Sequence, residues 1–552
     1  MTIFARRISA ALILAAFAAQ PDILMAATAD TSVIHTPAGD IRGEAAGNLN
    51  VFKGIPYAEA PVGALRWKAP VPKRPWKGVR EATSFGPACF QPTTKLNNIY
   101  ATDPYPMSED CLSLNIWAPR HAKKVPVFVW IHGGALWGGT SRDPMYDGAR
   151  LASRDIIVVS INYRLGVLGW LAHPELSAET PTGLSGNYGL LDQIEALRWV
   201  KKNIGAFGGD PNNVTVAGES AGALSVMYLM ASPLARGLFS KAIAESAYMI
   251  STPELKTARF GSPSSEQIGQ LVAQKVGAKN IAELRAIEPD KLTAMAAPAG
   301  FAPFAAVDGV TLTGQLVDVF DSGKQAQVPI LAGFNAGEIR SLKVLAPPAP
   351  KTAAEYESRI RESYGDLADA FLRLYPAAGY PESILATTRD ALYGWTAERL
   401  VRSQTHAGHP SYLYLWDHAY PAAEAAELHA FHASELPYVF GTFDGTPARW
   451  PKVPDTAEER KLSDTMIDYW TNFTKTGKPG SSSATTWPAY DASRGYMHFA
   501  TQPQPSQHLA PGMFELNEEV VCRRKEAGDQ AWNWNVGLAS PKMPPKVAAC
   551  GK

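Results

Sequence analysis

The chain has 552 residues, enough for about three or four ordinary domains or for one large, elaborated domain. Hydrophobic residues make up 46% of the sequence and charged residues 19%, a balance that is typical of a folded chain with a substantial core and excludes a disordered one. Lys plus Arg and Asp plus Glu are equal at 52 each, so no net positive charge is present to hold nucleic acid or an anionic membrane surface, and we expect no nucleic acid partner.

Residues 1–27 have the pattern of a secretory signal peptide. Arg6 and Arg7 precede an apolar run at 8–19, and small residues follow at 26–29, where we expect cleavage. The run is shorter than the roughly 20 apolar residues that a membrane-spanning helix needs, so a membrane anchor is the weaker alternative and we expect no stable membrane insertion. The sequence therefore predicts a secreted or periplasmic protein.

Buried strands alternate with a helix in the middle of the chain. Residues 125–131, 155–163 and 212–218 are continuous apolar runs rich in Val and Ile, as strands buried on both faces should be. Between the second and third runs, residues 188–204 carry apolar residues at helical spacing. This order predicts an α/β fold with a large, mostly parallel central sheet flanked by helices.

The flanking segments extend this architecture. Residues 33–70 predict a small N-terminal antiparallel sheet with Gly and Pro turns. Residues 254–300 and 353–405 are predicted to be mostly helical. Residues 329–335 and 411–418 are predicted to form two further strands of the sheet. Because no stretch resembles a linker, we expect one domain over 28–520, followed by a C-terminal extension over 521–552.

Four cysteines, Cys89, Cys111, Cys522 and Cys550, permit three disulfide pairings. Export would allow disulfides, and the clustering favours Cys89 with Cys111 and Cys522 with Cys550. Each bond would contribute about 3 kcal/mol by closing a loop of roughly 20 to 30 residues. Free buried thiols are the alternative. The sequence contains no C-x-x-C pair, so it does not support a zinc site.

The most informative stretch is VTVAGESAGA at 214–223, in which a predicted strand runs through a G-x-S-x-G pentapeptide into an apolar helix. In this context Ser220 is a candidate nucleophile on a sharp, strained turn, and the flanking glycines remove Cβ atoms that would clash there. The following helix begins at Ala221, and its N-terminus would stabilise an oxyanion. An ordinary exposed turn serine is the alternative.

A second source of oxyanion donors follows the strand at 125–131. His132-Gly133-Gly134-Ala135 is a small-residue loop of the HGGG type, whose backbone can approach a ligand closely. We assign oxyanion donation to Gly134, Ala135 and Ala221, against the alternative of an ordinary glycine-rich turn.

A serine nucleophile needs a base, and eleven histidines compete for this role. His432 precedes a strongly aromatic segment within AFHASELPYVFG at 430–441. His429 lies three residues earlier and could pair with it on a metal, but no further ligand cluster supports that alternative. We expect neither a metal nor a cofactor.

Three motifs carry a resemblance to the type-B carboxylesterases, the family that includes the cholinesterases and bacterial para-nitrobenzyl-type esterases. They are FKGIPYAEAPVGALRW at 52–67, SEDCLSLNIW at 108–117 and FGGDPNNVTVAGESAGA at 207–223, and the likeness spans roughly 33–500. The resemblance implies the α/β-hydrolase fold. It also supports the Cys89 to Cys111 bond and suggests an ion pair between Arg66 and Glu109.

The resemblance also implies the roles of the site residues. AVDG at 306–309 followed by PILAGFNAGE at 329–338 places the acidic triad member at Glu338, and H-x-x-E-L places the base at His432. Asp308 is the rival acid by sequence alone, although the family pattern gives it a structural role. Ser246 matches a serine that supports the triad through hydrogen bonds, and we place Glu219 beside it as a second supporting residue.

The sequence departs from the family at several positions. Ala135 stands where many members have a third glycine, and Glu245 and Ala247 flank Ser246 where the family often has Gln and Gly. The tail after residue 520 has no clear counterpart. Trp137 and Phe90 are candidates for lining the substrate pocket, because the corresponding family regions border it, although core packing is the alternative for either one.

These observations predict a secreted serine carboxylesterase that acts on small-molecule esters, with small or aromatic esters favoured over long lipids. One alternative is an amidase or carbamate hydrolase with the same triad, since the nucleophile and oxyanion donors serve those bonds too. A non-catalytic, cholinesterase-like binding module is another, but the complete triad argues against it.

Overall fold

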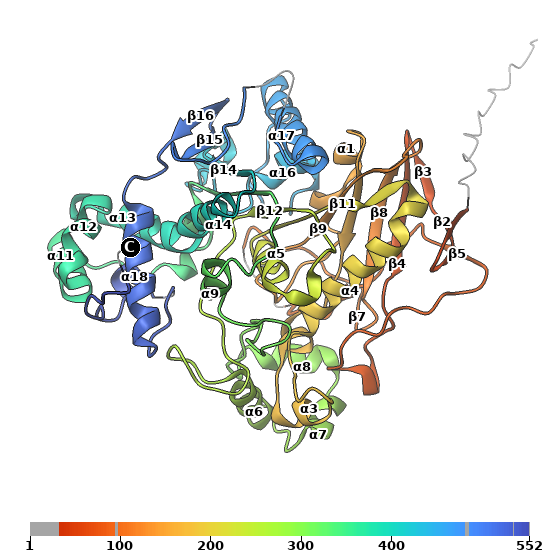
Figure 1. Cartoon of the computed structure of the whole chain (residues 1–552), viewed down its shortest axis with the longest axis horizontal. Helices are drawn as coiled ribbons and strands as arrows, with labels where there is room; N and C mark the ends of the chain where they lie inside the picture. Colours follow the sequence, from red (N-terminus) through yellow and green to blue (C-terminus); the bar gives the residue numbers. More distant parts are fainter. Residues whose placement is uncertain (1–32, 94–97, 481–484, 534, 551–552) are drawn as a thin grey trace, which may run out of the picture.

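The computed structural model describes residues 33–93, 98–480, 485–533 and 535–550, so the predicted signal peptide lies outside the described residues. One large sheet runs through the molecule, with helices on both of its faces (Figure 1). Among the described residues it has eleven strands, in the spatial order β16 (Pro503–Gln507), β15 (Gly495–Phe499), β14 (Ser411–Trp416), β13 (Ile330–Asn335), β12 (Lys241–Glu245), β11 (Gly209–Glu219), β9 (Val125–Ile131), β10 (Ile157–Ile161), β8 (Ser113–Pro119), β4 (Leu49–Pro56) and β3 (Glu44–Ala46).

The centre of this sheet is parallel and its edges are antiparallel. All neighbours from β10 to β15 pair in parallel, whereas β8, β4 and β3 at one edge and β16 at the other pair antiparallel. The carboxyl ends of β11, β12 and β13 therefore lie side by side, and this is where sheets of this class hold their functional residues.

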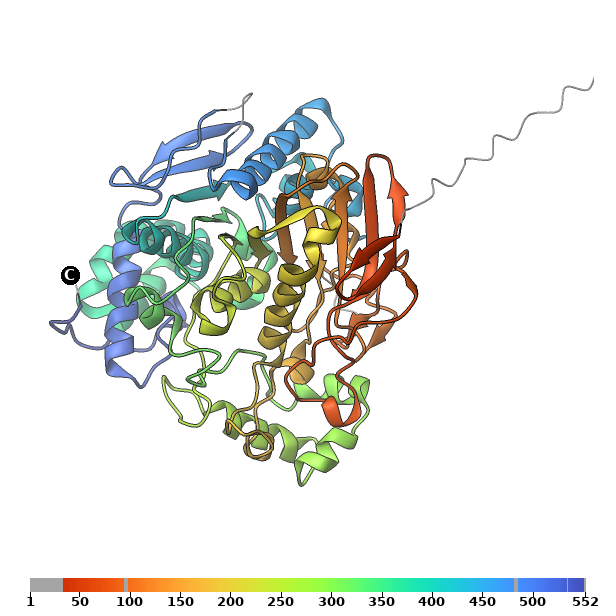
Figure 2. The same cartoon turned by 45° about the vertical axis from the view of Figure 1, so that its right-hand side comes forward.

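The N-terminal strands are divided between two sheets. β1 (Ile34–Thr36) and β2 (Gly39–Arg42) pair antiparallel, and β5 (Val79–Glu81) adds in parallel to complete a small three-stranded sheet. β3 and β4 instead extend the large sheet. Figure 2 shows these strands gathered at the end of the molecule opposite the C-terminus.

Helices pack on both faces of the sheet (Figure 1). Their bounds are α1 (Ala149–Ala152), α2 (Gly166–Trp170), α3 (Pro174–Ala178), α4 (Tyr188–Asn203), α5 (Ala221–Ala231), α6 (Ser265–Lys275), α7 (Ile281–Ala286), α8 (Pro289–Ala296), α9 (Leu316–Asp321), α10 (Glu338–Ser341), α11 (Ala353–Tyr364), α12 (Ala368–Leu374), α13 (Tyr380–Arg389), α14 (Trp395–His406), α15 (Pro421–Ala425), α16 (Leu436–Phe440), α17 (Ala457–Thr476) and α18 (Met513–Ala527). Of these, α11, α12, α13 and α18 gather at the end away from β3 (Figure 1). None of the helices in the described ranges combines the length and apolar character that crossing a membrane requires.

Two hydrophobic cores occupy the two faces of the sheet. Along β9, Val127 and Val129 belong to the core that includes α4 and α5, whereas Phe128 and Trp130 belong to the core that includes α16 and α17. The ring of Trp130 packs edge-on against Phe440 of α16, with the ring centroids 4.9 Å apart. This division explains why the strand sequences are continuously apolar, since alternate side chains enter different cores.

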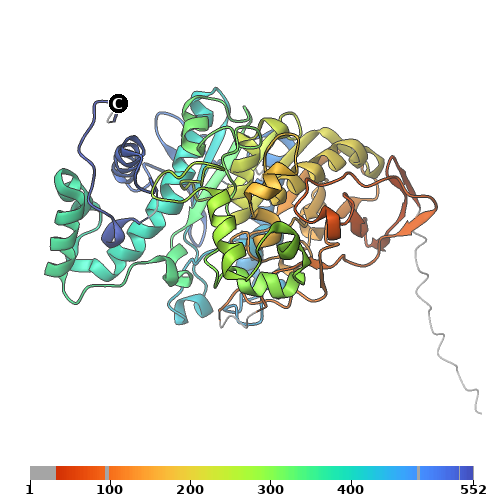
Figure 3. The same cartoon turned by 90° about the horizontal axis from the view of Figure 1, so that it is seen from below.

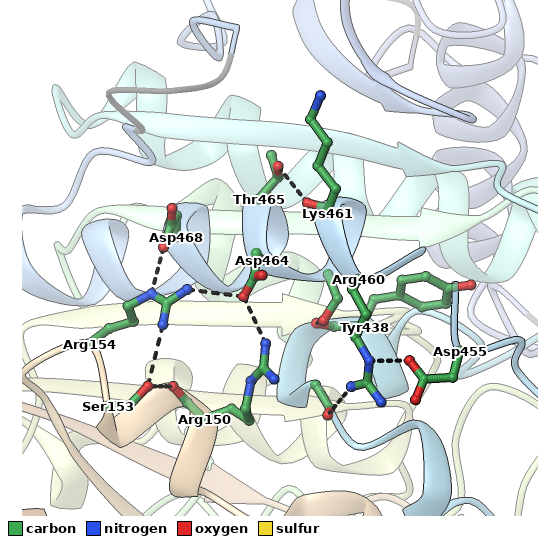
Figure 4. Close-up of polar contacts among 12 residues, drawn as sticks. Arg150, Ser153, Arg154, Tyr438, Asp455, Arg460, Lys461, Asp464, Thr465 and Asp468 are labelled. Atoms are coloured by element: carbon green, nitrogen blue, oxygen red, sulfur yellow. Dashed lines mark hydrogen bonds and ion pairs between the residues drawn. The ribbon is translucent and has the colours of Figure 1, made fainter. Parts of the chain in front are cut away.

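Ion pairs attach α17 to α1 across one face of the sheet (Figure 4). Arg150 Nη2 lies 2.8 Å from Asp464 Oδ1, and Arg154 contacts both Asp464 (3.1 Å) and Asp468 (2.8 Å). The side chains are partly exposed, so each pair contributes little to stability by itself.

Two disulfides join segments that are close in the sequence. Cys89 bonds Cys111, beside the parallel pair β6 (Ala88–Cys89) and β7 (Met107–Ser108). Cys522 of α18 bonds Cys550 in the tail. These are the pairings that the sequence predicts. The predicted Arg66–Glu109 ion pair is also present, with two contacts of 2.6 Å.

The C-terminal tail packs on the helices at one end of the molecule (Figure 3). Trp532 is fully buried beside Trp395 of α14, and Arg523 pairs with Asp366 at 2.8 Å. Because α18 runs from Met513 to Ala527, the predicted domain boundary at residue 520 falls inside a helix.

Candidate active site

The turn between β11 and α5 holds Ser220 in a strained conformation. Its φ is 56° and its ψ is −121°, outside the regions that non-glycine residues favour. Gly222 faces the end of β9, where an added Cβ would lie 2.0 Å from the carbonyl oxygen of Ile131, and a Cβ at Gly218 would collide with Gly222 itself. The two glycines therefore allow the close packing that places Ser220 at the end of the strand.

The predicted oxyanion loop lies against this turn. A Cβ on Gly133 would lie 2.9 Å from Glu219 and 3.3 Å from the Cβ of Ser220. Gly134 and Ala135 both have positive φ, at 106° and 55°, and both are exposed. Ala221 is the first residue of α5, so its N–H has no partner four residues earlier within the helix. Of the three predicted donors, Ala221 thus directly follows Ser220, while Gly134 and Ala135 continue the loop from Gly133, which lies against Ser220.

The predicted acid and base are in contact. Nδ1 of His432 bonds Oε2 of Glu338, at the start of α10, and both side chains are buried. The other oxygen of Glu338 accepts a hydrogen bond of 2.8 Å from the backbone N–H of Asn335. Asn335 also donates from its amide to the carbonyl oxygen of Phe431, which ties the acid-bearing turn to the loop that carries His432.

The second ring nitrogen of His432 contacts Glu219, which belongs to the turn that holds Ser220. Nε2 of His432 lies 3.0 Å from Oε1 of Glu219, the residue before Ser220. Within the described part of the chain, the structure records no hydrogen bond between Ser220 and His432. For Nε2 to accept a proton from Ser220, the serine hydroxyl would have to turn toward the imidazole beside Glu219.

Charge around His432 favours its protonated form. Burial alone would lower the pKa of the imidazole, but the negative charges of Glu219 and Glu338 outweigh burial and raise the pKa well above its usual value. Burial raises the pKa of Glu219, which the positive charge of His432 partly offsets. The imidazolium that forms during acyl transfer would thus be stabilised from both sides.

Two tyrosines beside the base were missed by the sequence analysis. The hydroxyl of Tyr100 donates to the carbonyl oxygen of His432 (2.9 Å) and lies 2.6 Å from Oγ of Ser341 in α10. The ring of Tyr393 lies 5.4 Å from the imidazole, measured between centroids. Only the position of Tyr100 between Cys89 and Cys111 was a signal in the sequence, because the family places that loop near the site.

Among the described residues, no hydrogen bond or ring contact joins the other predicted residues Trp137, Phe90 and Ser246 to His432 or Glu338. Trp137 is half-buried and packs edge-on against Phe301, while Phe90 is half-buried beside the Cys89–Cys111 bond. Ser246 is buried, and its hydroxyl has no hydrogen-bond partner among the described residues, so the predicted support through hydrogen bonds is not recorded.

The rival acid and the metal alternative have structural explanations. The carboxylate of Asp308 accepts hydrogen bonds from the backbone N–H groups at 310–312 and from Asn187, and so holds a turn. His429 pairs with Glu424 at the surface. Among the described residues, no group of three His, Cys, Asp or Glu side chains is placed to bind a metal ion.

Comparisons with known proteins identify the family of the chain. The model of the carboxylesterase family matches residues 30–516. The chain is 36% identical over 498 residues to a fumonisin B1 esterase of Sphingopyxis macrogoltabida, covering 85% of this chain and 86% of that one. It is 37% identical over 471 residues to a para-nitrobenzyl esterase of Bacillus subtilis, covering 83% and 92%.

Solved structures show the same fold. A PNB esterase structure superimposes with a TM-score of 0.75 at 34% identity, covering 88% of this chain and 99% of the other. Carboxylesterase EST55 of Geobacillus stearothermophilus gives a TM-score of 0.73 at 34% identity, covering 86% and 97%. Because the family model spans most of the chain and relatives above 30% identity cover it almost throughout, the chain belongs to the carboxylesterase family and is a carboxylic ester hydrolase with the α/β-hydrolase fold.

Proposed function

We propose that the protein is a serine carboxylesterase in which Ser220 is the nucleophile, His432 the base and Glu338 the acid that orients the base. The observation that carries this proposal is the buried contact between His432 and Glu338, directed at the turn that holds Ser220 in its strained conformation. Along the chain, the three residues follow the order serine, acid, histidine, which is that of α/β-hydrolases.

The reaction proceeds by acyl transfer. Nε2 of His432 accepts the proton of Ser220 while the serine oxygen attacks the ester carbonyl, and Glu338 stabilises the resulting imidazolium. The N–H groups of Gly134, Ala135 and Ala221 donate to the oxyanion, each contributing about 3 kcal/mol of transition-state stabilisation. His432 then protonates the departing alcohol, and water repeats the cycle on the acyl-enzyme.

The substrates that we propose are small or aromatic esters. Tyr100 and Tyr393 add aromatic surface beside the base, which suits aryl groups better than long alkyl chains. Relatives are named for para-nitrobenzyl esters and for fumonisin B1, so the substrate panel should contain both. An amide or carbamate substrate stays the alternative, because the same groups could act on those bonds.

We also propose export, with the mature chain beginning between residues 26 and 29. Two disulfides support this location, since such bonds persist in oxidising compartments. We propose one catalytic domain up to about residue 520 and a disulfide-linked tail beyond it.

The decisive experiment is labelling of the mature protein with a fluorophosphonate, followed by peptide mass spectrometry and p-nitrophenyl acetate turnover. We expect one label, on Ser220, with loss of turnover. Ser220→Ala should lower kcat by several orders of magnitude while the protein stays folded, because a triad serine acts as a unit with its base. Ser240→Ala, at a serine before β12, is the matched control and should label normally.

Two results would contradict the proposal. Retained ester turnover in Ser220→Ala would remove the nucleophile assignment. Hydrolysis of long-chain triglycerides at rates that match short p-nitrophenyl esters would remove the substrate class, and faster cleavage of a matched amide than of its ester would favour the amidase.

A further inference from the structure

Glu245, the last residue of β12, lies beside the nucleophile turn and has no role in the mechanism above. It is in register with Glu219 of β11 on one side and with Gly333 of β13 on the other. Its backbone oxygen accepts a hydrogen bond of 2.9 Å from the N–H of Ser220. Neighbouring strands lie about 4.8 Å apart, so the side chains of Glu219 and Glu245 leave the same face next to each other.

Only one of the two carboxyl oxygens of Glu245 has a hydrogen-bond partner among the described residues. The side chain is fully buried, and Oε1 accepts a hydrogen bond of 3.1 Å from Trp470 of α17. Oε2 has no donor among the described residues, and the same is true of Oε1 of the nearby Glu435. No Lys or Arg in the described part of the chain forms an ion pair with either glutamate. A buried carboxylate without a cation or donor is costly, whereas a protonated carboxyl is neutral and can itself donate.

The groups around Glu245 come from every element that packs there, and they are mostly acidic or neutral. They are Glu219 of β11, Tyr414 of β14, Glu435 before α16, Trp470 of α17 and the adjoining Ser246. None of these side chains can carry a positive charge, and the imidazole of His432 contacts Glu219 and Glu338 instead. An ionised Glu245 would therefore repel Glu219 without gaining a cation.

We propose that Glu245 is a positioning residue that works as a neutral carboxylic acid: while neutral it lets Glu219 stay beside His432, and its ionisation at alkaline pH displaces Glu219 and lowers turnover. This inference rests on the proposed assignment of His432 as the base. Burial, together with the negative charge of Glu219, raises the pKa of Glu245 to about 8, although the hydrogen bond from Trp470 opposes the shift. The group would thus be neutral at neutral pH and would ionise just above it.

The activity test compares the pH profiles of wild type, Glu245→Gln and Glu245→Ala with p-nitrophenyl acetate. Gln is a permanently neutral replacement of the same shape, so it should restore the neutral-pH kcat/KM that Ala lowers by about tenfold. Above pH 8 the wild-type kcat/KM should fall, whereas that of Glu245→Gln should stay within about twofold of its plateau. Superimposable profiles would overturn the proposal, as would a Gln variant no better than Ala.

The matched control is Glu398→Gln. Glu398 of α14 is also buried and bonds Tyr490, and burial raises its pKa too, but it lies outside the site. Its replacement should leave the pH profile of turnover unchanged.

A stability measurement tests the protonation of Glu245 independently of catalysis. In the unfolded chain the carboxyl loses its proton near its usual pKa of about 4.3, but in the folded protein it keeps the proton to about 8. Between these values the folded state binds more protons, so wild type should lose stability relative to Glu245→Gln as pH rises, up to a plateau.

The two readouts separate the possible failures. A difference in Tm between wild type and Glu245→Gln that does not change with pH would mean that Glu245 is ionised when folded, which overturns the proposal. A pH-dependent Tm difference with identical activity profiles would show a neutral Glu245 that does not act on the base, which also overturns it. Failure of Ser220 to label would instead reject the proposed function.

Discussion

At the scale of single residues, the chemistry depends on which charges touch one imidazole. His432 lies between Glu338 on Nδ1 and Glu219 on Nε2, and the charges of the two carboxylates raise its pKa despite burial. A base must be neutral to accept the proton of Ser220, so the acid limb of the activity profile should follow the pKa of His432.

We therefore predict that Glu219→Gln moves the acid limb of kcat/KM to lower pH. Removing one negative charge in contact with an imidazole lowers its pKa, because the charged form loses a favourable partner. The variant should be relatively more active than wild type in acid, even if its plateau falls because the imidazolium of the transition state loses a partner. The profile can be measured with p-nitrophenyl acetate over the range in which the protein stays folded, and an unmoved acid limb would show that Glu219 carries no charge in the free enzyme.

At the scale of elements, the segment between Cys89 and Cys111 links the loop of His432 to α10, which begins with Glu338. Its residue Tyr100 contacts both the backbone of His432 and Ser341 of α10. The disulfide closes this segment, and so limits how far Tyr100 can move from the two elements that it joins.

Replacing Cys89 and Cys111 together by Ser should lower kcat/KM, by about tenfold, because small displacements of a base are costly. Tyr100→Phe removes only the hydroxyl and should reproduce part of the loss with less effect on Tm. Both effects are read from p-nitrophenyl acetate kinetics and thermal unfolding. Unchanged kinetics in the double variant would show that the segment does not position His432.

At the scale of the whole molecule, the second disulfide joins the C-terminal tail to α18. Trp532 and Arg523 hold the tail against α14 and Asp366, and Cys522–Cys550 closes 28 residues of sequence.

Replacing both cysteines by Ser should cost about 3 kcal/mol of unfolding free energy in the loop-entropy picture, with kcat/KM unchanged. Denaturant unfolding and ester kinetics on the same preparation measure the two quantities, and a matching loss of activity would show that the tail contributes to the site.

Local patterns in the sequence were sufficient for the elements and for the nucleophile turn. The apolar runs at 125–131 and 329–335 became β9 and β13 nearly to the residue, because a strand buried on both faces must be continuously apolar. Ser220 was identifiable because its flanking glycines answer a steric demand within a few residues of chain. The placement of β3 and β4 in the large sheet could not be identified from the sequence, because strand pairing is not a local property.

The sequence by itself determined the fold class, the strained serine and the small-residue loop, because each follows from hydrophobic periodicity or from backbone sterics over a few neighbouring residues. Only the tertiary structure decided that Glu219 faces Nε2 of His432, that Tyr100 reaches the base, and that Glu245 lies buried beside Glu219 without a cation. These facts depend on contacts between distant segments, and on a low-polarity interior in which a carboxyl's charge is set by its neighbours rather than by its own side chain.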